Sequence, residues 1–176
     1  MESMSDVVLS PPTQTAPKKA LSQAELVALS QEWAPRVGNG GGSGQPDQRW
    51  YVRLEHNETY EVWLLGWNGT QNTEFHDHGG SSGAVTVIAG EIIEARLRHG
   101  GSVVRRSMSP GSTFSFGPQA IHDVQNAGNG ASLSVHVYSP PLAQQTYYEP
   151  DVDGVKPVRT IAVAGPEEGA LDLTEY

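Results

Sequence analysis

The sequence predicts an all-β fold, built as a sandwich or a small barrel, with one or two helices ahead of it. Two observations indicate this class. Short segments rich in β-branched, aromatic and aliphatic residues recur from residue 49 onward, and clusters of Gly, Asn, Pro and Ser separate many of them. The chain contains no internal repeat of solenoid length. Many short strands with turn signals between them are typical of sandwiches and barrels.

The candidate strands share this composition, and one helix is expected before them. The strands are predicted at residues 60–65, 84–88, 91–97, 102–106, 112–116, 121–125, 133–138 and 158–162. Ser22 can cap the helix while Glu25 reaches back to form a capping box. Leu26 and Leu29 follow at helical spacing. Pro35 is expected to end the helix.

We expect one domain at residues 21–164, with a disordered tail at 1–20 and a loosely held tail at 165–176. A chain of 176 residues is typical of a single domain and can bury a core around one sheet system. Residues 1–20 are rich in Ser, Pro and Thr and show no periodicity. The stretch 38–44 is mostly glycine and predicts a flexible loop.

The charge and the composition exclude several classes of partner. Lys and Arg total 11 against 20 Asp and Glu, so the formal net charge is −9. Without a basic cluster, nucleic acids and membrane surfaces are excluded as main partners. No apolar run approaches the ~20 residues that span a bilayer, and the first residues lack a secretory pattern, so we expect a cytoplasmic protein. The chain has no cysteine, so a metal site must rely on His, Asp or Glu.

The histidines are the candidate metal ligands. His76 and His78 are separated by one residue, and alternate side chains on a strand project from one face, so both could reach one ion. Two solvated histidines at a strand end are the commoner meaning of such a pair. His122 lies in a second predicted strand, and taken alone it could equally be a metal ligand or an ordinary histidine. His56 and His99 have polar, turn-like surroundings and are expected to be solvated.

The predicted strand at 133–138 alternates apolar and polar residues. Its polar face carries Ser134, His136 and Tyr138. A half-exposed strand with a polar outer face is the more frequent explanation. However, these groups are neutral and form hydrogen bonds, and each can lie near the next along the strand. A relay of this kind would suit a polar interior, where such groups must be paired.

These residues together resemble the cupin superfamily. The run from His76 to Gly90 has the spacing of the first cupin motif, but Gly83 takes the slot of the usual metal-binding Glu. The second motif is matched at Gly111, His122 and Asn126. The resemblance implies a cupin double-stranded β-helix, which is a jelly-roll barrel, with the metal inside the barrel mouth.

Within this superfamily, the chain resembles the cysteine dioxygenase family over roughly residues 48–148. That family binds its metal through three histidines without a carboxylate. It also carries a Ser-x-His-x-Tyr strand followed by Ser-Pro-Pro, and this chain reads the same from Ser134 to Pro141. The family's Tyr-x-Arg strand is matched by Tyr51-Val52-Arg53.

The resemblance implies an Fe(II)-dependent thiol dioxygenase that oxidises L-cysteine with O₂ to cysteine sulfinic acid, acting as a monomer. The implied metal ligands are His76, His78 and His122. The implied substrate-binding residues are Arg53, for the carboxylate, and Tyr51. The implied catalytic residues are Tyr138, His136 and Ser134, where Ser134 orients His136 and His136 orients the Tyr138 hydroxyl.

Two departures from the family bear on the substrate. Animal members have a cysteine at the Gly83 position, joined to the tyrosine by a thioether, whereas this chain has no cysteine and Tyr138 cannot be crosslinked. In this respect it is similar to bacterial-type members. A sister group that acts on 3-mercaptopropionate tends to have Gln at the position of Arg53, so Arg53 favours an amino-acid thiol.

Other functions remain open at the level of the sequence. One is a dioxygenase for 3-mercaptopropionate or another small thiol. Another is a non-catalytic cupin that binds a small ligand or stores a metal, against which the set formed by Ser134, His136 and Tyr138 argues. A third is a nickel or manganese site for isomerase or oxalate chemistry, and the missing Glu ligand argues against it.

Overall fold

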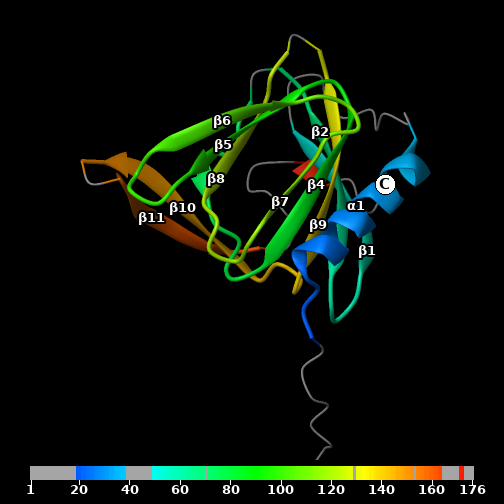
Figure 1. The fold of residues 1–176 in the computed structure, drawn as a ribbon, viewed down its shortest axis with the longest axis horizontal. Coiled ribbons are helices and arrows are strands. Elements are labelled where there is room, and N and C mark those ends of the chain that lie inside the picture. The colour runs from blue at the N-terminus through cyan, green and yellow to red at the C-terminus, as the bar shows by residue number, and fades with distance from the viewer. Residues whose placement is uncertain are drawn as a thin grey trace, which may run out of the picture.

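The structure, a computed structural model, describes residues 19–38, 49–69, 71–128, 130–152, 154–163 and 171–172. Two six-stranded sheets face each other, and one helix lies outside them (Figure 1). The first sheet has the order β12 (Leu171–Asp172), β1 (Trp50–His56), β2 (Glu61–Trp67), β9 (Ser132–Ser139), β4 (Ser82–Ala89), β7 (Thr113–Phe116). The second has the order β11 (Gly154–Ala162), β10 (Gln144–Asp151), β3 (Phe75–His76), β8 (His122–Asn126), β5 (Ile92–Leu97), β6 (Val103–Met108).

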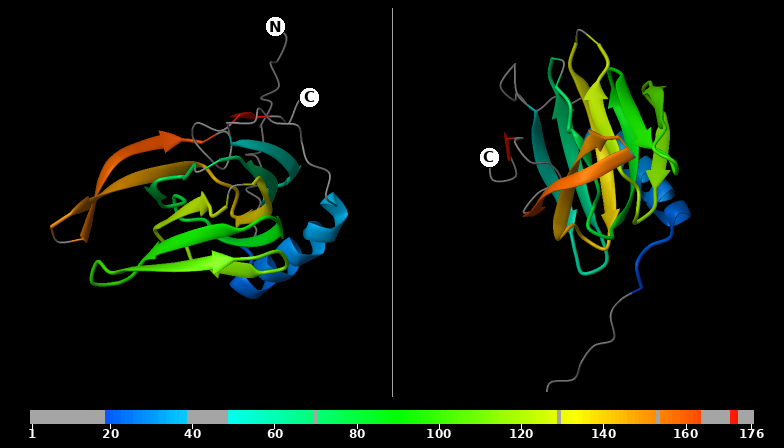
Figure 2. Two further views of the ribbon diagram at one scale, coloured as in Figure 1. Left: turned by 90° about the horizontal axis from the view of Figure 1, so that it is seen from above. Right: turned by 90° about the vertical axis from the view of Figure 1, so that its left-hand side faces the viewer.

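The strand pairing confirms the predicted all-β fold with an N-terminal helix. Neighbouring strands are antiparallel except for β1 and β12, which are parallel. The predicted strands all occur, with ends that differ by a few residues. Two further views show the sheets as separate layers (Figure 2). Apolar residues from both layers, including Trp63, Val85, Ile92 and Val124, form one cluster between them.

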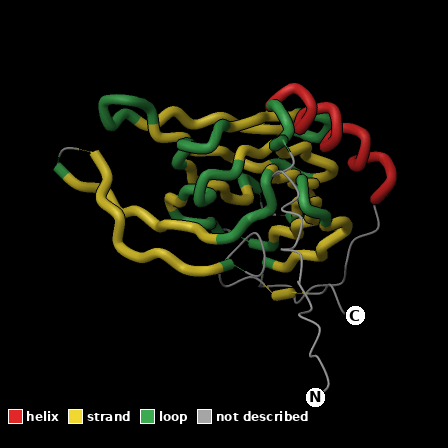
Figure 3. Tube along the Cα trace, turned by 90° about the horizontal axis from the view of Figure 1, so that it is seen from below, coloured by secondary structure: helices red, strands yellow, loops and turns green. Residues whose placement is uncertain are grey.

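The helix α1 (Gln23–Val37) covers the outer face of the first sheet (Figure 3). Its capping box is present as predicted, because Ser22 Oγ accepts from Glu25 N at 3.3 Å and Glu25 Oε2 accepts from Ser22 N at 2.7 Å. Leu26 is fully buried against β4 and β9, in a cluster with Val135. The helix therefore buries the apolar face of β9 from outside.

The prediction that Pro35 ends the helix is wrong, because α1 continues through Pro35 to Val37. Proline fixes φ near a helical value, so the backbone can continue through residue 35, although the hydrogen bond of one N–H is lost. The helix ends instead at Gly38, whose φ of 62° takes the backbone out of the helical region.

Two strands of the second sheet, β10 (Gln144–Asp151) and β3 (Phe75–His76), are not among the strands that composition predicted. β10 is polar and contains Pro150, so it lacks the apolar composition of the other strands. It pairs with β11 along its length and with β3 at Tyr147 and Tyr148. β3 has only two residues, yet it brings His76 between β10 and β8. Long-range pairing, rather than local composition, defines both strands.

Some predictions fall mainly outside the described residues. These are the disordered tail at 1–20, the glycine loop at 38–44 and the loosely held tail at 165–176. Within the last of these, Leu171 and Asp172 pair with Trp50 and Tyr51 of β1. The division into one domain at 21–164 with two tails remains our prediction.

Candidate metal centre

Three histidines converge between the two sheets, as the sequence predicted. His76 on β3 pairs in register with His122 on β8, and His78 follows His76 by two residues. The exposed fractions of His76, His78 and His122 are 3%, 1% and 2%. The ring centroids lie 4.8–5.1 Å apart, and one nitrogen of each ring lies within 4.8 Å of the others. Within the described part of the chain, these three histidines are the group of side chains that lie close enough together to hold one metal ion.

The way in which His78 reaches the site differs from the prediction. We expected both histidines to project from one strand, but β3 ends at His76 and His78 lies in the turn that follows. Asp77 holds this turn against β10, because Asp77 Oδ1 accepts from Thr146 N at 3.1 Å and Asp77 Oδ2 accepts from Tyr148 Oη at 2.7 Å. The Asp77 carboxylate is thereby directed to β10.

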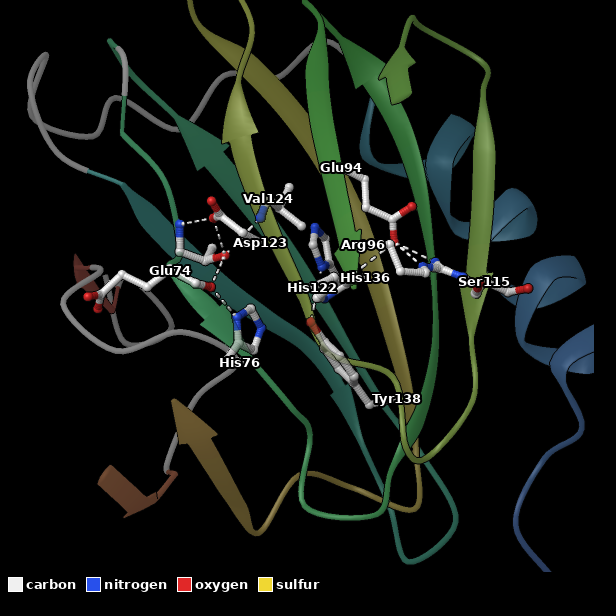
Figure 4. Close-up of polar contacts among 11 residues, drawn as sticks. Glu74, His76, Glu94, Arg96, Ser115, His122, Asp123, Val124, His136 and Tyr138 are labelled. Atoms are coloured by element: carbon white, nitrogen blue, oxygen red, sulfur yellow. Dashed lines mark hydrogen bonds and ion pairs between the residues drawn. The ribbon is translucent and has the colours of Figure 1, made fainter. Parts of the chain in front are cut away.

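Two ligands have a hydrogen-bond acceptor on their outer nitrogen (Figure 4). The Nδ1 atom of His76 lies 2.9 Å from the carbonyl oxygen of Glu74, and the Nδ1 atom of His122 lies 3.0 Å from Glu94 Oε1. A carbonyl or carboxylate oxygen accepts, so each Nδ1 donates a proton. In a neutral ring, Nε2 then keeps its lone pair for a metal ion.

Burial keeps the His76 and His78 rings in the metal-binding form. Burial lowers the pKa of His76 to about 3, and the neighbouring His122 contributes to this. Burial likewise holds the pKa of His78 well below its usual value. Neutral imidazole is the form that binds metals. Burial alone would raise the pKa of the Glu94 carboxyl, but the hydrogen bond from His122 and the charge of Arg96 bring it below its usual value.

The side chain of His78 indicates that an ion belongs at this place. In the described structure, both of its ring nitrogens are buried without a hydrogen-bond partner. Its ring stacks with Phe116 at 4.4 Å and with Tyr138 at 5.5 Å between centroids, which fixes the plane of the ring. Buried polar atoms are almost always satisfied. A metal ion bound by His76, His78 and His122 would satisfy one of them, and three imidazoles suit iron and several other transition metals.

Gly83 explains why no carboxylate ligand comes from this position. Gly83 lies between Tyr138 on β9 and Phe116 on β7 in the register of the first sheet. A Cβ atom at this position would lie 2.3 Å from Phe116 Cζ. The Phe116 ring therefore fills the space that a side chain at residue 83 would need.

The polar face of β9 points inward, toward the histidines. Ser134 Oγ lies 2.9 Å from His136 Nε2, and His136 Nδ1 lies 3.0 Å from the Tyr138 hydroxyl. Trp67 Nε1 donates to Ser134 Oγ at 2.9 Å. The more frequent explanation, a solvent-exposed polar face, is wrong for this strand, because every residue of β9 is buried. The helix covers the apolar face, which leaves the polar face between the sheets.

Arg53 and Tyr51 lie on the same inner face, at its edge. Arg53 is exposed, and its guanidinium carbon lies 5.2 Å from the centroid of the Trp63 ring. Tyr51 is 8% exposed and meets the Trp63 ring edge-on at 5.1 Å. In register, Arg53 pairs with Trp63 and Trp63 pairs with His136. Arg53 is thus two strands away from His136, roughly 10 Å between Cα atoms.

Several residues at this centre were missed from the sequence, namely Glu94, Arg96, Phe116, Trp63 and Trp67. Glu94 and Arg96 offer one signal, since they are oppositely charged, separated by one residue and set among the apolar residues of the predicted strand 91–97. The remaining three look like ordinary core aromatics. His56 and His99 are exposed, in agreement with their predicted surroundings.

Comparison with known proteins agrees with this geometry. The family described as cysteine dioxygenase type I matches residues 45–150, more than half of the chain. A protein from Thermus thermophilus aligns with 19% identity and a TM-score of 0.50, covering 57% of this chain and 90% of its own. A cupin superfamily protein from Desulfitobacterium hafniense aligns with 10% identity and a TM-score of 0.48, covering 56% and 83%.

An oxalate oxidase in complex with glycolate aligns with 17% identity and a TM-score of 0.49 over 56% of this chain, which spans 54% of the oxidase. The likeness to the Thermus thermophilus protein concerns the fold alone. Of the helices that the structure describes, none has the length and the apolar character needed to cross a membrane. By its family match, the chain belongs to the cysteine dioxygenase type I family.

Proposed function

We propose that this protein is an Fe(II)-dependent dioxygenase that converts L-cysteine and O₂ into cysteine sulfinic acid. The observation that carries the proposal is the juxtaposition of a buried three-histidine group with the inward-facing side chains of β9 in a member of this family. Fe(II) held by His76, His78 and His122 would supply the redox chemistry that joins both atoms of O₂ to the thiol sulfur.

The three ligands favour a thiolate substrate. All are neutral imidazoles, and within the described residues no carboxylate joins them, so the ion would keep its full positive charge. In a buried site this charge attracts an anionic sulfur strongly. The protein would thereby leave the negative charge of the centre to be supplied by the substrate.

The hydrogen bonds along β9 would direct a proton toward the substrate. Because Trp67 donates to Ser134 Oγ, the Ser134 hydroxyl can donate to His136 Nε2. Burial lowers the pKa of His136 to about 3, so its ring is neutral and carries its proton on Nδ1. The Nδ1–H group then donates a hydrogen bond to the Tyr138 oxygen. By this hydrogen bond His136 would orient the Tyr138 hydroxyl toward the bound thiol or oxygen.

Arg53 would bind the carboxylate of the substrate. A guanidinium forms two parallel hydrogen bonds to a carboxylate, which fixes the orientation of the substrate as well as its position. The Trp63 ring supports Arg53 from one side, and Tyr51 contacts the same ring. In this proposal Arg53, at the edge of the inner face, would hold the end of the thiol that lies away from the metal.

The test is oxygen uptake by protein loaded anaerobically with Fe(II). L-cysteine, 3-mercaptopropionate and cysteamine are compared, with sulfinate quantified by mass spectrometry. We expect the highest kcat/KM with L-cysteine and one O₂ consumed per sulfinate. Preference for 3-mercaptopropionate would retain the reaction but change the substrate. Stoichiometric metal binding without thiol-dependent oxygen uptake would instead support a non-catalytic metal-binding cupin. Light scattering of the same preparation tests the proposed monomer.

A further inference from the structure

A buried carboxylate lies directly behind one of the metal ligands. Glu94 on β5 is fully buried, and its Oε1 atom accepts a hydrogen bond from His122 Nδ1 at 3.0 Å. In register, Glu94 pairs with Val124 and Arg96 pairs with His122, so Glu94 approaches the His122 ring diagonally across β5 and β8. Figure 4 shows Glu94 on the side of His122 opposite to His76.

Arg96 fixes this carboxylate in place. Its Nε atom donates to Glu94 Oε1 at 2.9 Å, and its Nη2 atom contacts the same oxygen. Nη2 also donates to the carbonyl oxygen of Ser115 on β7, at 2.9 Å. Because β7 belongs to the first sheet, Arg96 spans the two layers. A continuous series of contacts thus leads from β7 through Arg96 and Glu94 to His122.

The three histidines differ in the group that accepts a hydrogen bond from the ring. His76 donates to a neutral backbone carbonyl, and His78 has no hydrogen-bond partner in the described structure. His122 alone of the three donates to a carboxylate. A carboxylate behind a ligating imidazole fixes the ring and makes the metal-bound nitrogen a stronger electron donor.

Stability gives a poor explanation for this buried pair. Placing an Arg and a Glu in the interior costs desolvation free energy that their attraction often fails to offset, and apolar residues of similar size are commonly as stabilising. The contact of Glu94 with the metal ligand His122 gives a functional reason for burying the pair. Phe116 also fills the space beside Gly83, the slot of the carboxylate ligand in other cupins, so a carboxylate can approach the metal only indirectly there.

We propose that Glu94 is a positioning residue for the metal centre, which fixes the His122 ring and places a negative charge behind it, and that Arg96 holds Glu94 in this position. The inference rests on the metal centre of the proposed function but not on its substrate. His122 is then the strongest donor among the three ligands, and the carboxylate that other cupins bind directly to the metal acts here through an imidazole.

The first test is a titration of the metal-free protein with Co(II), followed by its visible absorption. Glu94→Gln keeps the size of the side chain and an acceptor oxygen but removes the charge. We expect Co(II) to bind roughly 10- to 100-fold more weakly, with a shifted absorption spectrum. Glu91→Gln is the matched control, because it removes an exposed Glu just before the same strand and should leave both quantities unchanged.

The second test uses the unaltered chain, so it holds even if Glu94→Gln does not fold. In the Zn(II)-loaded protein, ¹⁵N-resolved NMR of the histidine rings reports which nitrogen carries a proton. We expect the His122 Nδ1 proton to exchange slowly with water and to resonate further downfield than that of His76. A His122 ring without a proton on Nδ1, or one whose proton exchanges as fast as that of exposed His99, would overturn the proposal.

The outcomes separate this inference from the proposed function. If the unaltered protein binds no Co(II), the metal centre itself fails. If it binds Co(II) and Glu94→Gln binds with the same affinity and spectrum, the metal centre stands and the role of Glu94 is refuted. If both binding tests succeed while cysteine is not oxidised, Glu94 keeps its role in a centre of another function.

Discussion

The two sheets contribute different chemistry to the space between them. The first sheet supplies Ser134, His136 and Tyr138, which bond in series along β9. The second supplies His76 and His122, each with an acceptor on its outer nitrogen. Metal binding is therefore concentrated on one layer and, in our proposal, proton donation and substrate binding on the other. This division means that the two tasks can be disturbed separately.

Their outer faces differ as well, and this difference explains how β9 can carry its polar residues inward. α1 covers the apolar side of β9, so the strand is buried on both faces. In the second sheet, β6 exposes nearly all of its residues and needs polar side chains on its outside. The covering helix thus allows β9 to be buried on both faces, whereas β6 has no such cover and remains exposed.

The largest expected effect is loss of the metal from the second sheet. His122→Ala removes one of three ligands, and we expect Co(II) affinity to fall by more than the ~100-fold typical of residues behind a ligand. The exposed His99→Ala is the control and should bind Co(II) as the unaltered protein does. Retention of tight binding in His122→Ala would break the assignment of metal binding to this sheet.

Acid should destabilise the metal-free protein through both sheets. Burial lowers the pKa of His76 and of His136 to about 3, below the unfolded value of 6.5. The unfolded state therefore binds more protons, and stability present above pH 6.5 is lost as the pH falls toward 3. Each group contributes up to about 1.4 kcal/mol per pH unit in this range.

The measurement is urea unfolding of the metal-free protein at pH values between 7 and 5. His136→Gln should reduce the pH dependence of the free energy of unfolding by the contribution of one histidine. An unchanged slope in His136→Gln would show that His136 is not buried in its neutral form.

Tyr138→Phe should separate the two sheets most clearly. Removing the hydroxyl takes away the donor at the end of the β9 series, and a positioned proton donor contributes roughly 100-fold or more to a rate. We expect kcat to fall by about this factor while Fe(II) content and Co(II) affinity stay unchanged. Full activity with iron retained would remove Tyr138 from the mechanism.

Gly83→Ala should disturb both sheets through Phe116. The added Cβ would lie 2.3 Å from Phe116 Cζ, and this ring stacks with His78. Overpacking of this kind costs about 1–3 kcal/mol, measurable by thermal unfolding. Gly130→Ala, where a Cβ meets nothing within 4 Å, is the matched control. Adding Phe116→Leu should recover part of the loss if the clash with Phe116 is its cause.

The smallest expected effect belongs to the rim of the first sheet. Arg53→Gln should raise KM for L-cysteine by about tenfold, since a hydrogen bond to a charged group contributes roughly 1.5–3 kcal/mol. KM for cysteamine, which has no carboxylate, should change little. Equal changes for both thiols would mean that Arg53 does not bind the carboxylate.

The parts of the fold that local patterns determine could be predicted from the sequence. Ser22 and Glu25 identify the start of α1, and apolar β-branched runs identify most strands. β10 could not be predicted in this way, because its polar residues become a strand through pairing with β11 and β3. The same reason hid β3, whose two residues form a strand only between its neighbours.

The residues of the candidate site also divide into those that local sequence patterns predict and those that depend on strand pairing. The convergence of His76, His78 and His122 could be expected from motif spacing, which encodes the positions of the strands that carry them. Glu94 and Phe116 were missed because their roles depend on register, across β5 and β8 for Glu94 and across β4 and β7 for Phe116. A side chain that acts through a neighbour on another strand produces no characteristic residue spacing in the sequence.

Asp123 lies next to one ligand and holds the loop that leads to another. Its Oδ1 atom accepts from Thr73 N at 3.1 Å and from Thr73 Oγ1 at 3.2 Å, and Thr73 Oγ1 accepts from Val124 N at 2.9 Å. These bonds tie the segment that leads to His76 to the strand that carries His122, so the distance between the two histidines is fixed by them. An engineer who wished to widen the centre for a larger ion could not shift either histidine alone, because both would move as one unit.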